Sequence, residues 1–535
     1  MKISDCLRIL GPLAEDFFLP PGTVENTELR GVANSSSSVE KGFLFCAIKG
    51  SRTDGHQYLP DAVRRGAVLL VLSSSFPHPP VPGASSSSSP CPDGIPWIRV
   101  TDSYDAWARI CAEYFGNPGD ALEIHGITGT NGKTSTAFLL RHFLNGCCEE
   151  QDADSEKNGK NGGSHGKSTP SSSCALLSTI LTDTGKGCIR EATGTTPDAW
   201  NLQRLFLEAK NNSCRALVME TSSHGLSQHR PGTTKFCSGI FTNLTGDHLD
   251  YHKSMEAYYQ AKKILFSEML RKNAVAVINI DDEWGERLSG ELRSERPDLR
   301  ILDLSGKKSD AFCFIRDFTL SANGTDISVI LDGQHLSLHS PLIGTHNVWN
   351  LLSAMTAAYG ASGISLSLLQ TKLRTAPAAP GRLQHIRLGN GALAFVDYAH
   401  TDDALFRVLS TLRQLIKGNG KILTLFGCGG DRDRTKRPRM GKVASEFSDI
   451  LILTSDNPRS ESPDSIIREI QQGIPHDRGD CFVLPDRAEA IRKAVSLASE
   501  GDLILVAGKG HETTQEIQGV RYHFDDMEEL EKFKA

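Results

Sequence analysis

The segment from residue 126 to 135 reads Gly-Ile-Thr-Gly-Thr-Asn-Gly-Lys-Thr-Ser and has the residue types of a phosphate-binding loop. Its glycines allow the backbone N–H groups to turn inward, its lysine adds a full positive charge, and its hydroxyl groups suit Mg²⁺. An apolar strand is predicted at 122–127 and a helix at 136–144, which is the usual setting of such a loop. The residues expected to bind nucleotide phosphate are Gly129, Thr130, Asn131, Gly132, Lys133, Thr134 and Ser135.

The loop departs from the strict pattern, because Ile127 stands where a glycine is expected and the nearest glycine is Gly126. The alternative interpretation is a glycine-rich turn that binds no ligand. Agreement between strand, loop, lysine and helix favours the nucleotide site.

Two further predicted strands end in polar residues that suit a metal. The strand at 216–219 ends at Glu220, and the strand at 239–242 leads to His248. Either residue alone is more typical of a capped turn or a surface histidine. Next to a phosphate loop the metal interpretation is favoured, because phosphoryl transfer needs a cation to neutralise charge.

Length and composition indicate a multidomain enzyme. At 535 residues the chain should form about three domains, since single cores rarely exceed about 250–300 residues. A formal net charge of -6 gives no basic face for nucleic acid, and no apolar run reaches membrane-spanning length. The thirteen cysteines lack metal-type spacing, and the first residues lack a long apolar core, so a reduced, cytoplasmic protein is expected.

Shifts in composition divide the chain into three α/β domains. We predict a small domain at 1–104, a central phosphate-loop domain at 105–380 and a third domain at 381–535, which follows a Pro/Ala-rich linker at 375–380. A Ser/Pro-rich stretch at 76–96 is predicted to be a surface loop. A Gly/Ser-rich stretch at about 146–173 is predicted to be a disordered insertion.

The third domain alternates predicted strands and helices, which is typical of an open α/β sheet. Four of its strands end in polar clusters, at 397–400, 427–433, 456–459 and 508–512. Four such clusters at one edge are more than a structural sheet needs, and they indicate a ligand site there.

With these residues in view, the chain resembles the Mur ligases, the ATP-dependent family that builds the peptide stem of bacterial peptidoglycan. The resemblance spans nearly the whole chain. The motifs that carry it, in order, are Gly129–Thr134, Glu220–His224, Asn243–His248, Asn347 with Asn350, Gly381-Arg382 and Asp397–His400. It implies a uridine-binding first domain, a central parallel-sheet ATPase domain and a Rossmann-like third domain that close over the substrates. It further implies ATP binding by Asn347, Arg382 and Asp397.

Within the family the chain is most similar to members that join meso-2,6-diaminopimelate to UDP-N-acetylmuramoyl-L-alanyl-D-glutamate. By that resemblance the residues that hold the incoming amino acid are Arg432, Asp456, Asn457, Arg459, Gly508 and Glu512. The chemistry agrees, because diaminopimelate carries a second amino-acid head whose carboxylate suits an arginine fork and whose ammonium suits Glu512. Lysine lacks that carboxylate.

The resemblance also implies the catalytic groups. Lys133, His224, His248 and Lys262 are expected to be catalytic, with an acyl phosphate as intermediate. Lys262 is expected to react with CO₂ to form a carbamate (N6-carboxylysine). Two Mg²⁺ ions are expected, with Thr134, Glu220, His248 and carbamylated Lys262 as ligands. The residues expected to hold the UDP-linked substrate are Ser35, Asp54, His56, Thr195, Thr196, Ser222, Gln228 and Arg230.

The sequence departs from the family pattern near the expected uridine contacts, with Asn34-Ser35-Ser36 where the family usually has Asp-Ser-Arg. Rival interpretations are a sister ligase that adds L-lysine or L-ornithine, a folylpolyglutamate synthase-like ligase, and a nucleotide-dependent binding module without amide-forming activity. A monomer without nucleic-acid or membrane partners is expected.

Overall fold

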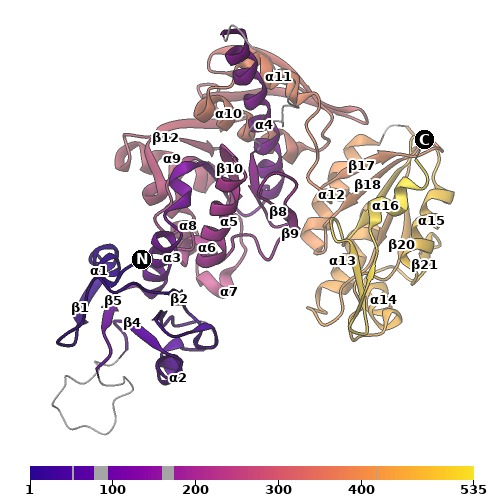
Figure 1. The fold of residues 1–535 in the computed structure, drawn as a ribbon. Helices are drawn as coiled ribbons and strands as arrows, with labels where there is room; N and C mark the ends of the chain where they lie inside the picture. The colour runs from indigo at the N-terminus through magenta and orange to yellow at the C-terminus, as the bar shows by residue number, and fades with distance from the viewer. Residues whose placement is uncertain (51–52, 77–93, 159–173, 417, 535) are drawn as a thin grey trace, which may run out of the picture. The chain divides into compact units, whose positions relative to one another are not determined.

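The computed structural model describes residues 1–50, 53–76, 94–158, 174–416 and 418–534. These residues fall into two compact units (Figure 1). Unit 1 consists of Met1–Lys133 and Cys147–Ile301, and unit 2 consists of Thr134–Gly146 and Leu302–Ala535.

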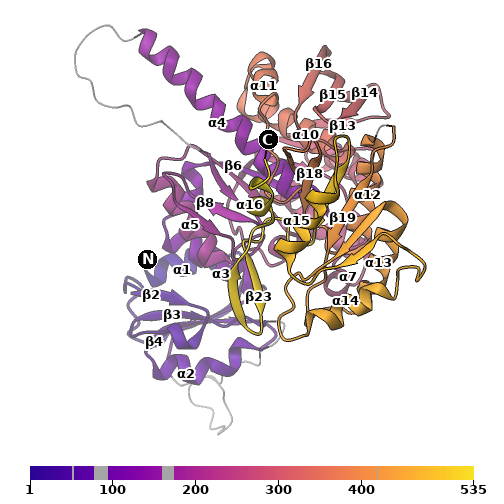
Figure 2. The same ribbon diagram turned by 90° about the vertical axis from the view of Figure 1, so that its right-hand side faces the viewer.

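Unit 1 begins with a five-stranded sheet in the order β1-β5-β4-β3-β2. Only β1 is antiparallel to its neighbour. Figure 2 shows β2, β3 and β4 side by side, with α2 next to them. The strands are β1 (Ala14–Phe18), β2 (Gly31–Ala33), β3 (Phe43–Cys46), β4 (Ala67–Ser73) and β5 (Trp97–Val100), and the helices are α1 (Ile3–Leu10), α2 (Leu59–Arg64) and α3 (Ser103–Tyr114).

The rest of unit 1 is built on a second sheet, whose strands run in the order β12-β11-β6-β10-β7-β8-β9. The first five are parallel, and β8 and β9 extend the edge as antiparallel strands. Its strands are β6 (Glu123–Thr128), β7 (Ala175–Leu177), β8 (Leu181–Asp183), β9 (Ile189–Glu191), β10 (Ala216–Glu220), β11 (Phe236–Phe241) and β12 (Leu270–Asn279). Its helices are α5 (Ala199–Asn211), α6 (Ser223–Ser227), α7 (Leu249–His252), α8 (Met255–Ile264), a π-helix (Leu265–Met269) and α9 (Glu283–Glu295).

The helix that follows the glycine-rich loop is longer than predicted. It is α4, which spans Lys133–Asn158, whereas the sequence predicted a helix only to residue 144. The predicted disordered insertion is therefore helical up to residue 158, because the Glu, Gln, Ala and Lys residues after 148 are compatible with a helix. Residues 159–173, and residues 77–93 of the predicted surface loop, lie outside the described residues.

A β-rich segment follows at residues 300–340. β13 (Arg300–Ser305) pairs in parallel with β14 (Cys313–Ser321), and β15 (Gly324–Leu331) and β16 (Gln334–Ser340) follow as antiparallel neighbours. Two helices come next, α10 (Thr345–Ser362) and α11 (Leu366–Leu373).

The C-terminal part of unit 2 is a six-stranded sheet in the order β17-β18-β22-β19-β20-β21. All neighbours are parallel except β17 with β18. The strands are β17 (Gln384–Arg387), β18 (Leu393–Asp397), β19 (Ile422–Phe426), β20 (Ile450–Leu453), β21 (Cys481–Val483) and β22 (Leu503–Ala507), followed by the hairpin β23 (Thr514–Ile517) and β24 (Val520–His523). The helices are α12 (Asp402–Leu415), α13 (Lys436–Phe447), α14 (Pro463–Gln471), α15 (Arg487–Leu497) and α16 (Asp526–Glu531).

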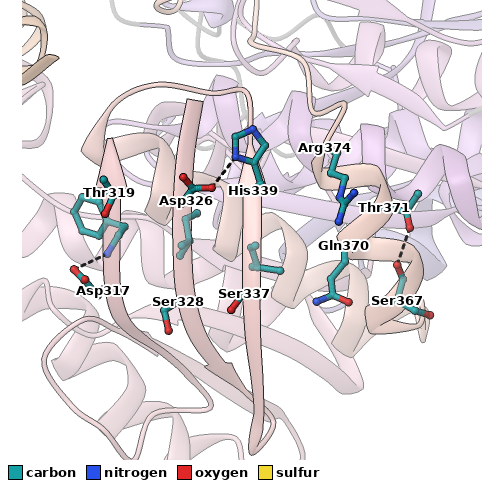
Figure 3. Close-up of a pocket in the computed structure, with 13 residues that line it drawn as sticks. Asp317, Thr319, Asp326, Ser328, Ser337, His339, Ser367, Gln370, Thr371 and Arg374 are labelled. Carbon is teal, nitrogen blue, oxygen red and sulfur yellow. Dashed lines mark hydrogen bonds and ion pairs between the residues drawn. The ribbon is translucent and has the colours of Figure 1, made fainter. Parts of the chain in front are cut away.

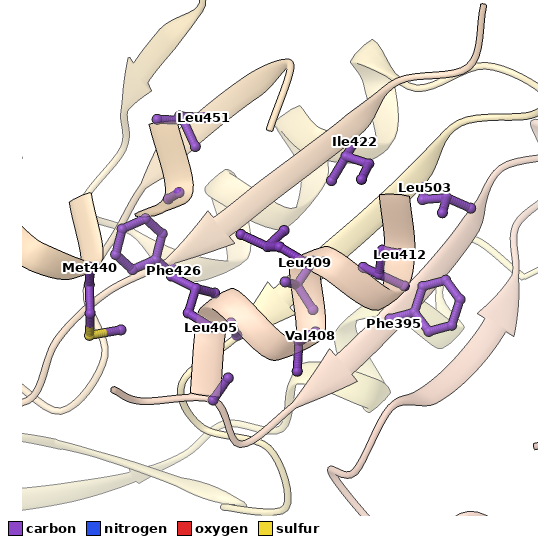
Figure 4. Packing of buried hydrophobic residues seen from close by; sticks show 14 of the residues in the cluster. Phe395, Leu405, Val408, Leu409, Leu412, Ile422, Phe426, Met440, Leu451 and Leu503 are labelled. Atoms are coloured by element: carbon purple, nitrogen blue, oxygen red, sulfur yellow. The ribbon is translucent and has the colours of Figure 1, made fainter. Parts of the chain in front are cut away.

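Alternation along these strands divides the core of the C-terminal sheet between its two faces. On β22, Leu503 and Leu505 join one apolar cluster and Ile504 and Val506 join the other. The first cluster includes residues of α12, α13 and α14, and Figure 4 shows Leu405, Val408, Leu409 and Leu412 of α12 within it. The second includes residues of α15 and α16. Strands buried on both faces account for the continuous apolar runs in the sequence.

The predicted α/β class with parallel sheets is confirmed. The strands β1–β5, β6–β16 and β17–β22 form separate sheets, and each group falls within one of the three predicted domains. The domain boundaries at 104/105 and 380/381 stay predictions. Across the described ranges, no helix combines the length and the apolar composition needed to span a bilayer.

We expect Leu409→Ala to lower the free energy of unfolding of the C-terminal sheet by about 2–5 kcal/mol, because this fully buried side chain would leave a cavity in a packed core. Gln414→Ala on the exposed side of the same helix is the control and should change stability by no more than about 0.5 kcal/mol. Urea denaturation measures both. Equal midpoints for the two variants would contradict the packing described.

Candidate active site

The glycine-rich loop lies between the end of β6 at Thr128 and the start of α4 at Lys133, as the sequence predicted. Gly129 has a φ of +148°, and a Cβ on this residue would lie 1.9 Å from Thr242 Oγ1. Thr242 Oγ1 donates a hydrogen bond to the Asn131 carbonyl at 2.6 Å. Only glycine can therefore occupy position 129 while the loop packs this closely on the end of β11.

Asn243 holds the loop in shape, and sequence reasoning gave it no role of its own. Its Oδ1 accepts from Asn131 N at 3.0 Å, its Nδ2 donates to Asn131 O at 3.1 Å, and its carbonyl accepts from Thr130 N at 2.9 Å. The available signal was its position directly after a buried strand beside the phosphate loop. Because these bonds fix the backbone in advance, less ordering remains for a phosphate ligand to impose.

Lys133 lies at the start of α4 with its Nζ over the loop. The ammonium donates to the Gly129 carbonyl at 3.0 Å and to the Thr130 carbonyl at 2.8 Å. The next residue, Thr134, is buried, and Ser135 is partly buried. The loop thus presents one cation and backbone N–H groups at a helix N-terminus, which is the arrangement that binds phosphate.

Lys262, in α8, is almost fully buried, which is unusual for a lysine side chain. Its Nζ donates to the Gly129 carbonyl at 2.8 Å and lies 4.5 Å from the centre of the Tyr258 ring. Burial, and then the nearby Lys133 ammonium, lower the pKa of Lys262 well below its ordinary value. The amine is therefore biased toward its neutral, nucleophilic form.

His224 and His248 come together, as the sequence predicted, with ring centres 5.0 Å apart. A third histidine, His252, lies beside them; its ring centre is 5.4 Å from that of His224, and its Nε2 is 2.9 Å from Ser223 Oγ. Burial, and then the neighbouring His224, lower the pKa of His252 to about 4. Burial also lowers the pKa of His224. His252 lies one helical turn after His248, and sequence reasoning gave it no role.

Glu220 lies fully buried at the end of β10. Its Oε1 accepts from Thr179 N at 2.8 Å and its Oε2 accepts from Thr179 Oγ1 at 3.2 Å. Within the part of the chain that is described, no three His, Cys, Asp or Glu side chains are arranged to hold a metal ion.

Four residues predicted to hold the UDP-linked substrate form one hydrogen-bonded cluster, consisting of Thr196, Ser222, Gln228 and Arg230. Thr196 Oγ1 accepts from Ser222 N at 2.9 Å, and Arg230 Nη1 donates to the Thr196 carbonyl at 2.5 Å. Arg230 also donates to Gln228 Oε1 through Nε and Nη2, at 3.1 and 2.8 Å. Thr195 lies next to this cluster and accepts from Thr179 at 3.1 Å.

The three predicted uridine contacts lie in segments that connect the strands of the five-stranded sheet. Ser35 is exposed, and its Oγ is 2.8 Å from Ser37 Oγ. His56 is buried with both ring nitrogens in use: Nδ1 lies 2.6 Å from Asp54 Oδ1, and Nε2 accepts from Ser73 N at 3.0 Å. His56 therefore anchors its own loop, a role that sequence reasoning did not assign.

In unit 2 the residues predicted to bind ATP occupy two places. Asn347 is buried in the first turn of α10, where its Nδ2 donates to the Ile343 carbonyl at 2.8 Å. Arg382 lies with its guanidinium 5.1 Å from the Tyr398 ring centre, and its buried Nε has no hydrogen-bond partner among the residues that the structure describes. Asp397 accepts from Leu383 N at 2.8 Å, and burial raises the pKa of its carboxyl group.

The loops after β20 and β22 meet, as the sequence predicted for the amino-acid site. Asn457 Nδ2 donates to Glu512 Oε2 at 2.7 Å, which joins the two loops. Lys509, to which sequence reasoning gave no role, is fully buried; its Nζ donates to the Thr514 carbonyl at 2.5 Å and lies 3.4 Å from Glu512 Oε2. A lysine between Gly508 and Gly510 in a loop after a strand was the signal for it.

Of the two predicted arginines, Arg459 is partly buried and Arg432 is exposed. Arg459 Nη1 donates to the Gly430 carbonyl at 2.7 Å, and its Nε lies 3.6 Å from Glu516 Oε2. The backbone of Arg459 also accepts from Gln518 N at 2.8 Å and donates to Glu516 O at 3.0 Å. The loop after β20 is thus tied to the hairpin β23–β24.

A separate hollow of about 540 Å³ lies on unit 2 between the polar face of β14–β16 and α11 (Figure 3). His339 Nδ1 lies 2.8 Å from Asp326 Oδ1 across its strands, and Arg374, Gln370 and Ser367 line the side formed by the helix. None of the predicted site residues lines it.

Comparison with family models places three matches along the chain. They are the Mur ligase family, catalytic domain, at residues 28–101, the Mur ligase middle domain at 162–358, and the Mur ligase, glutamate ligase domain, at 381–510. The three matches follow the same order as the three sheets.

Curated relatives match over almost the full length. A protein of Trichormus variabilis is 38% identical over 530 residues, which cover 99% of this chain and 98% of the relative. A protein of Bacteroides thetaiotaomicron is 39% identical, with coverage of 94% and 95%. Both are named UDP-N-acetylmuramoyl-L-alanyl-D-glutamate--2,6-diaminopimelate ligase. A solved structure of a ligase of the same name is 30% identical, with a TM-score of 0.67, and the match covers 99% of this chain and 98% of that one. On these matches the chain belongs to the Mur ligase family.

Proposed function

We propose that this ATP-dependent, amide-forming ligase joins meso-2,6-diaminopimelate to the D-glutamate carboxylate of UDP-N-acetylmuramoyl-L-alanyl-D-glutamate. The observation that carries the proposal is the joined pair of loops after β20 and β22, where Asn457 bonds to Glu512 beside Arg459. Full-length similarity to ligases named for this reaction supports it.

The first step of the proposed reaction activates the substrate. The γ-carboxylate of D-glutamate attacks the γ-phosphorus of ATP, which forms an acyl phosphate and releases ADP. Residues 129–135 would hold the phosphates, and Lys133 would neutralise the charge that spreads over the transferred group. Thr195, Thr196, Ser222, Gln228 and Arg230 would hold the nucleotide-sugar peptide, with Ser35 and Asp54 near its uridine end. Asn347, Arg382 and Asp397 would hold ATP; the orphaned Arg382 Nε supports a ligand there.

The donor set fits Mg²⁺ bound jointly by protein and nucleotide. A hydroxyl from Thr134 and a carboxylate from Glu220 are hard oxygen donors, and Mg²⁺ usually takes few protein ligands and completes its shell with phosphates and water. This agrees with the absence of a ready-made three-ligand group among the described residues. We propose two ions, with His248 and carbamylated Lys262 as further ligands; when bound, they would neutralise phosphate charge.

The burial of Lys262 supports its modification. A neutral amine adds to CO₂ through its nitrogen lone pair and loses one proton, which leaves an anionic carbamate. The lowered pKa of Lys262 keeps the amine neutral. Lys133, whose charge disfavours a second cation at this position, would attract an anion there. His224 and His248 would orient the groups around the reacting carboxylate.

The second step forms the amide. The amine of diaminopimelate attacks the acyl carbon, a tetrahedral intermediate collapses, and phosphate leaves. Arg459 or Arg432 would bind the carboxylate of the distal amino-acid head, and Glu512 would bind its ammonium. Asp456, Asn457 and Gly508 would complete the acceptor site. Lysine and ornithine lack the distal carboxylate and would leave the arginine unpaired.

The rival interpretations explain less. A binding module without activity does not account for the buried amine beside the glycine-rich loop. A folylpolyglutamate synthase-like ligase gives no reason for the five-stranded sheet at the N-terminus or for the loop of residues 456–459. A sister ligase with a lysine or ornithine acceptor is the alternative that requires an experiment.

We expect phosphate release from ATP with the UDP-linked dipeptide to require meso-diaminopimelate. Arg459→Ala should lower kcat/KM for this acceptor by about 10- to 100-fold, which is the usual cost of losing a charged hydrogen-bonded contact. Arg439→Ala, an exposed change in the same domain, is the control. Preference for L-lysine or L-ornithine would show that the acceptor is assigned wrongly, whereas absence of turnover with all three would reject the proposed substrates.

We expect Gly129→Ala to weaken ADP binding by about tenfold or more, because its Cβ would collide with Thr242 Oγ1 and distort the loop. Gly290→Ala in α9, where no atom lies within 4 Å of the new Cβ, should bind ADP normally. Isothermal titration calorimetry measures both affinities. If the Gly129 variant binds ADP with unchanged affinity, the glycine-rich loop does not bind the nucleotide as proposed.

We expect Lys262→Ala to reduce turnover by about 10²-fold or more, since it removes a charged group from the reacting centre. Short carboxylic acids added to this variant should restore part of the activity, because they replace the carbamate oxygens. Lys263→Ala is the matched control, since that lysine pairs with Glu291 and Glu295 at 2.8 Å. A carbamate signal at residue 262 in wild-type protein supplied with ¹³C-bicarbonate should be visible by NMR, and its absence would leave Lys262 as a packing residue.

A further inference from the structure

The loops that begin at Asp456 and Gly508 come from strands that are not neighbours, because β19 lies between β20 and β22. The loops nevertheless meet closely. A Cβ on Gly508, whose φ is +114°, would lie 2.8 Å from Asp456 Oδ2. A small relative shift of the two loops would therefore change the shape of the acceptor site between them.

One buried guanidinium contacts the backbone at the start of both loops. Arg487, the first residue of α15, donates from Nη1 to the Ser455 carbonyl at 3.4 Å and from Nη2 to the Ala507 carbonyl at 3.1 Å. Ser455 and Ala507 directly precede Asp456 and Gly508. A single planar group thus sets the positions of two carbonyls on different strands.

The guanidinium is itself held rigidly. Asp526, the first residue of α16, accepts from Arg487 Nε and Nη2 through its two carboxylate oxygens, each at 2.7 Å. Both side chains are fully shielded from solvent. This two-pronged geometry fixes the plane of the guanidinium, and a buried ion pair of this kind gives little net stability compared with apolar residues of similar size. Its effect on the site is therefore better explained by geometry than by stability.

We propose that Arg487 and Asp526 are positioning residues that set the loop of Asp456 against the loop of Gly508 and thereby determine the affinity and selectivity for the acceptor amino acid. This inference rests on the proposed function, since it assumes that these loops bind the acceptor. Neither residue touches the substrate in this proposal; both act through the backbone carbonyls of Ser455 and Ala507.

A purely structural role predicts something different. If the pair only stabilises the C-terminal sheet, its loss would lower the unfolding midpoint and leave the kinetic constants of the folded enzyme unchanged. If it positions the loops, the KM for the acceptor would rise while the KM for ATP stays near its wild-type value.

The experiment uses the full chain and two variants of the pair. Arg487→Lys keeps the charge but loses the planar fork. The double variant Arg487→Met with Asp526→Leu removes both buried charges and retains similar volume, so that no unpaired charge unfolds the protein. Arg478→Met is the matched control, because Arg478 also binds backbone carbonyls, those of Ser445 in α13 and Ser448 just after that helix, which lie near the opposite end of β20.

We expect both pair variants to raise the KM for meso-diaminopimelate by about tenfold and to weaken discrimination against L-lysine, with the KM for ATP changed by less than about twofold. The Arg478→Met control should leave the KM for meso-diaminopimelate, the discrimination against L-lysine and the KM for ATP unchanged. Wild-type kinetic constants in a folded pair variant, or an equal change in the Arg478 variant, would overturn the positioning role. The wild-type enzyme is assayed first: if it does not turn over meso-diaminopimelate, the proposed function fails, and that outcome is distinct from a failure of the positioning role.

Discussion

Parallel strands in one sheet end at the same edge, and this constraint governs where the polar residues of this protein lie. In unit 1, β6, β10 and β11 are adjacent and parallel, so the glycine-rich loop, Glu220 and Thr242 all follow neighbouring strand ends. In unit 2, β18, β22, β19 and β20 deliver four polar loops in the same way. Many of the polar groups therefore lie in short loops whose backbone is held by apolar strands, while Lys262 is added to the first of these edges by helix α8.

At these sheet edges, close packing of neighbouring residues holds the polar loops in place. The loop of residues 129–133 is held in shape by hydrogen bonds that Thr242 and Asn243 form with Asn131. Lys262 comes within hydrogen-bonding distance of the Gly129 carbonyl because α8 is packed against this loop. The same burial that excludes water from the lysine also changes its protonation, so packing and reactivity have a common cause.

The sequence was sufficient to predict the parallel sheets, the glycine-rich loop and the four polar clusters, because each depends on local patterns of apolar and polar residues. Composition alone could not separate Lys262 from Lys263, since both lie in one amphipathic stretch; only the resemblance to the Mur ligases singled out Lys262. Arg487 and Asp526 are 39 residues apart and join only through the fold. The length of α4 was underestimated, because the polar composition after residue 146 suggested disorder while its local helix propensity did not exclude a helix.

The contacts around Asn457 bear on how such a site changes over evolution. Asn457 is bonded to Glu512 through its amide nitrogen, and its Oδ1 accepts from Glu516 N at 2.9 Å. These groups share one hydrogen-bond network around the buried Asn457, so the effects of substitutions here are coupled rather than additive. If these loops hold the acceptor amino acid, as proposed, a change of acceptor would therefore involve several of these residues together rather than any one of them alone.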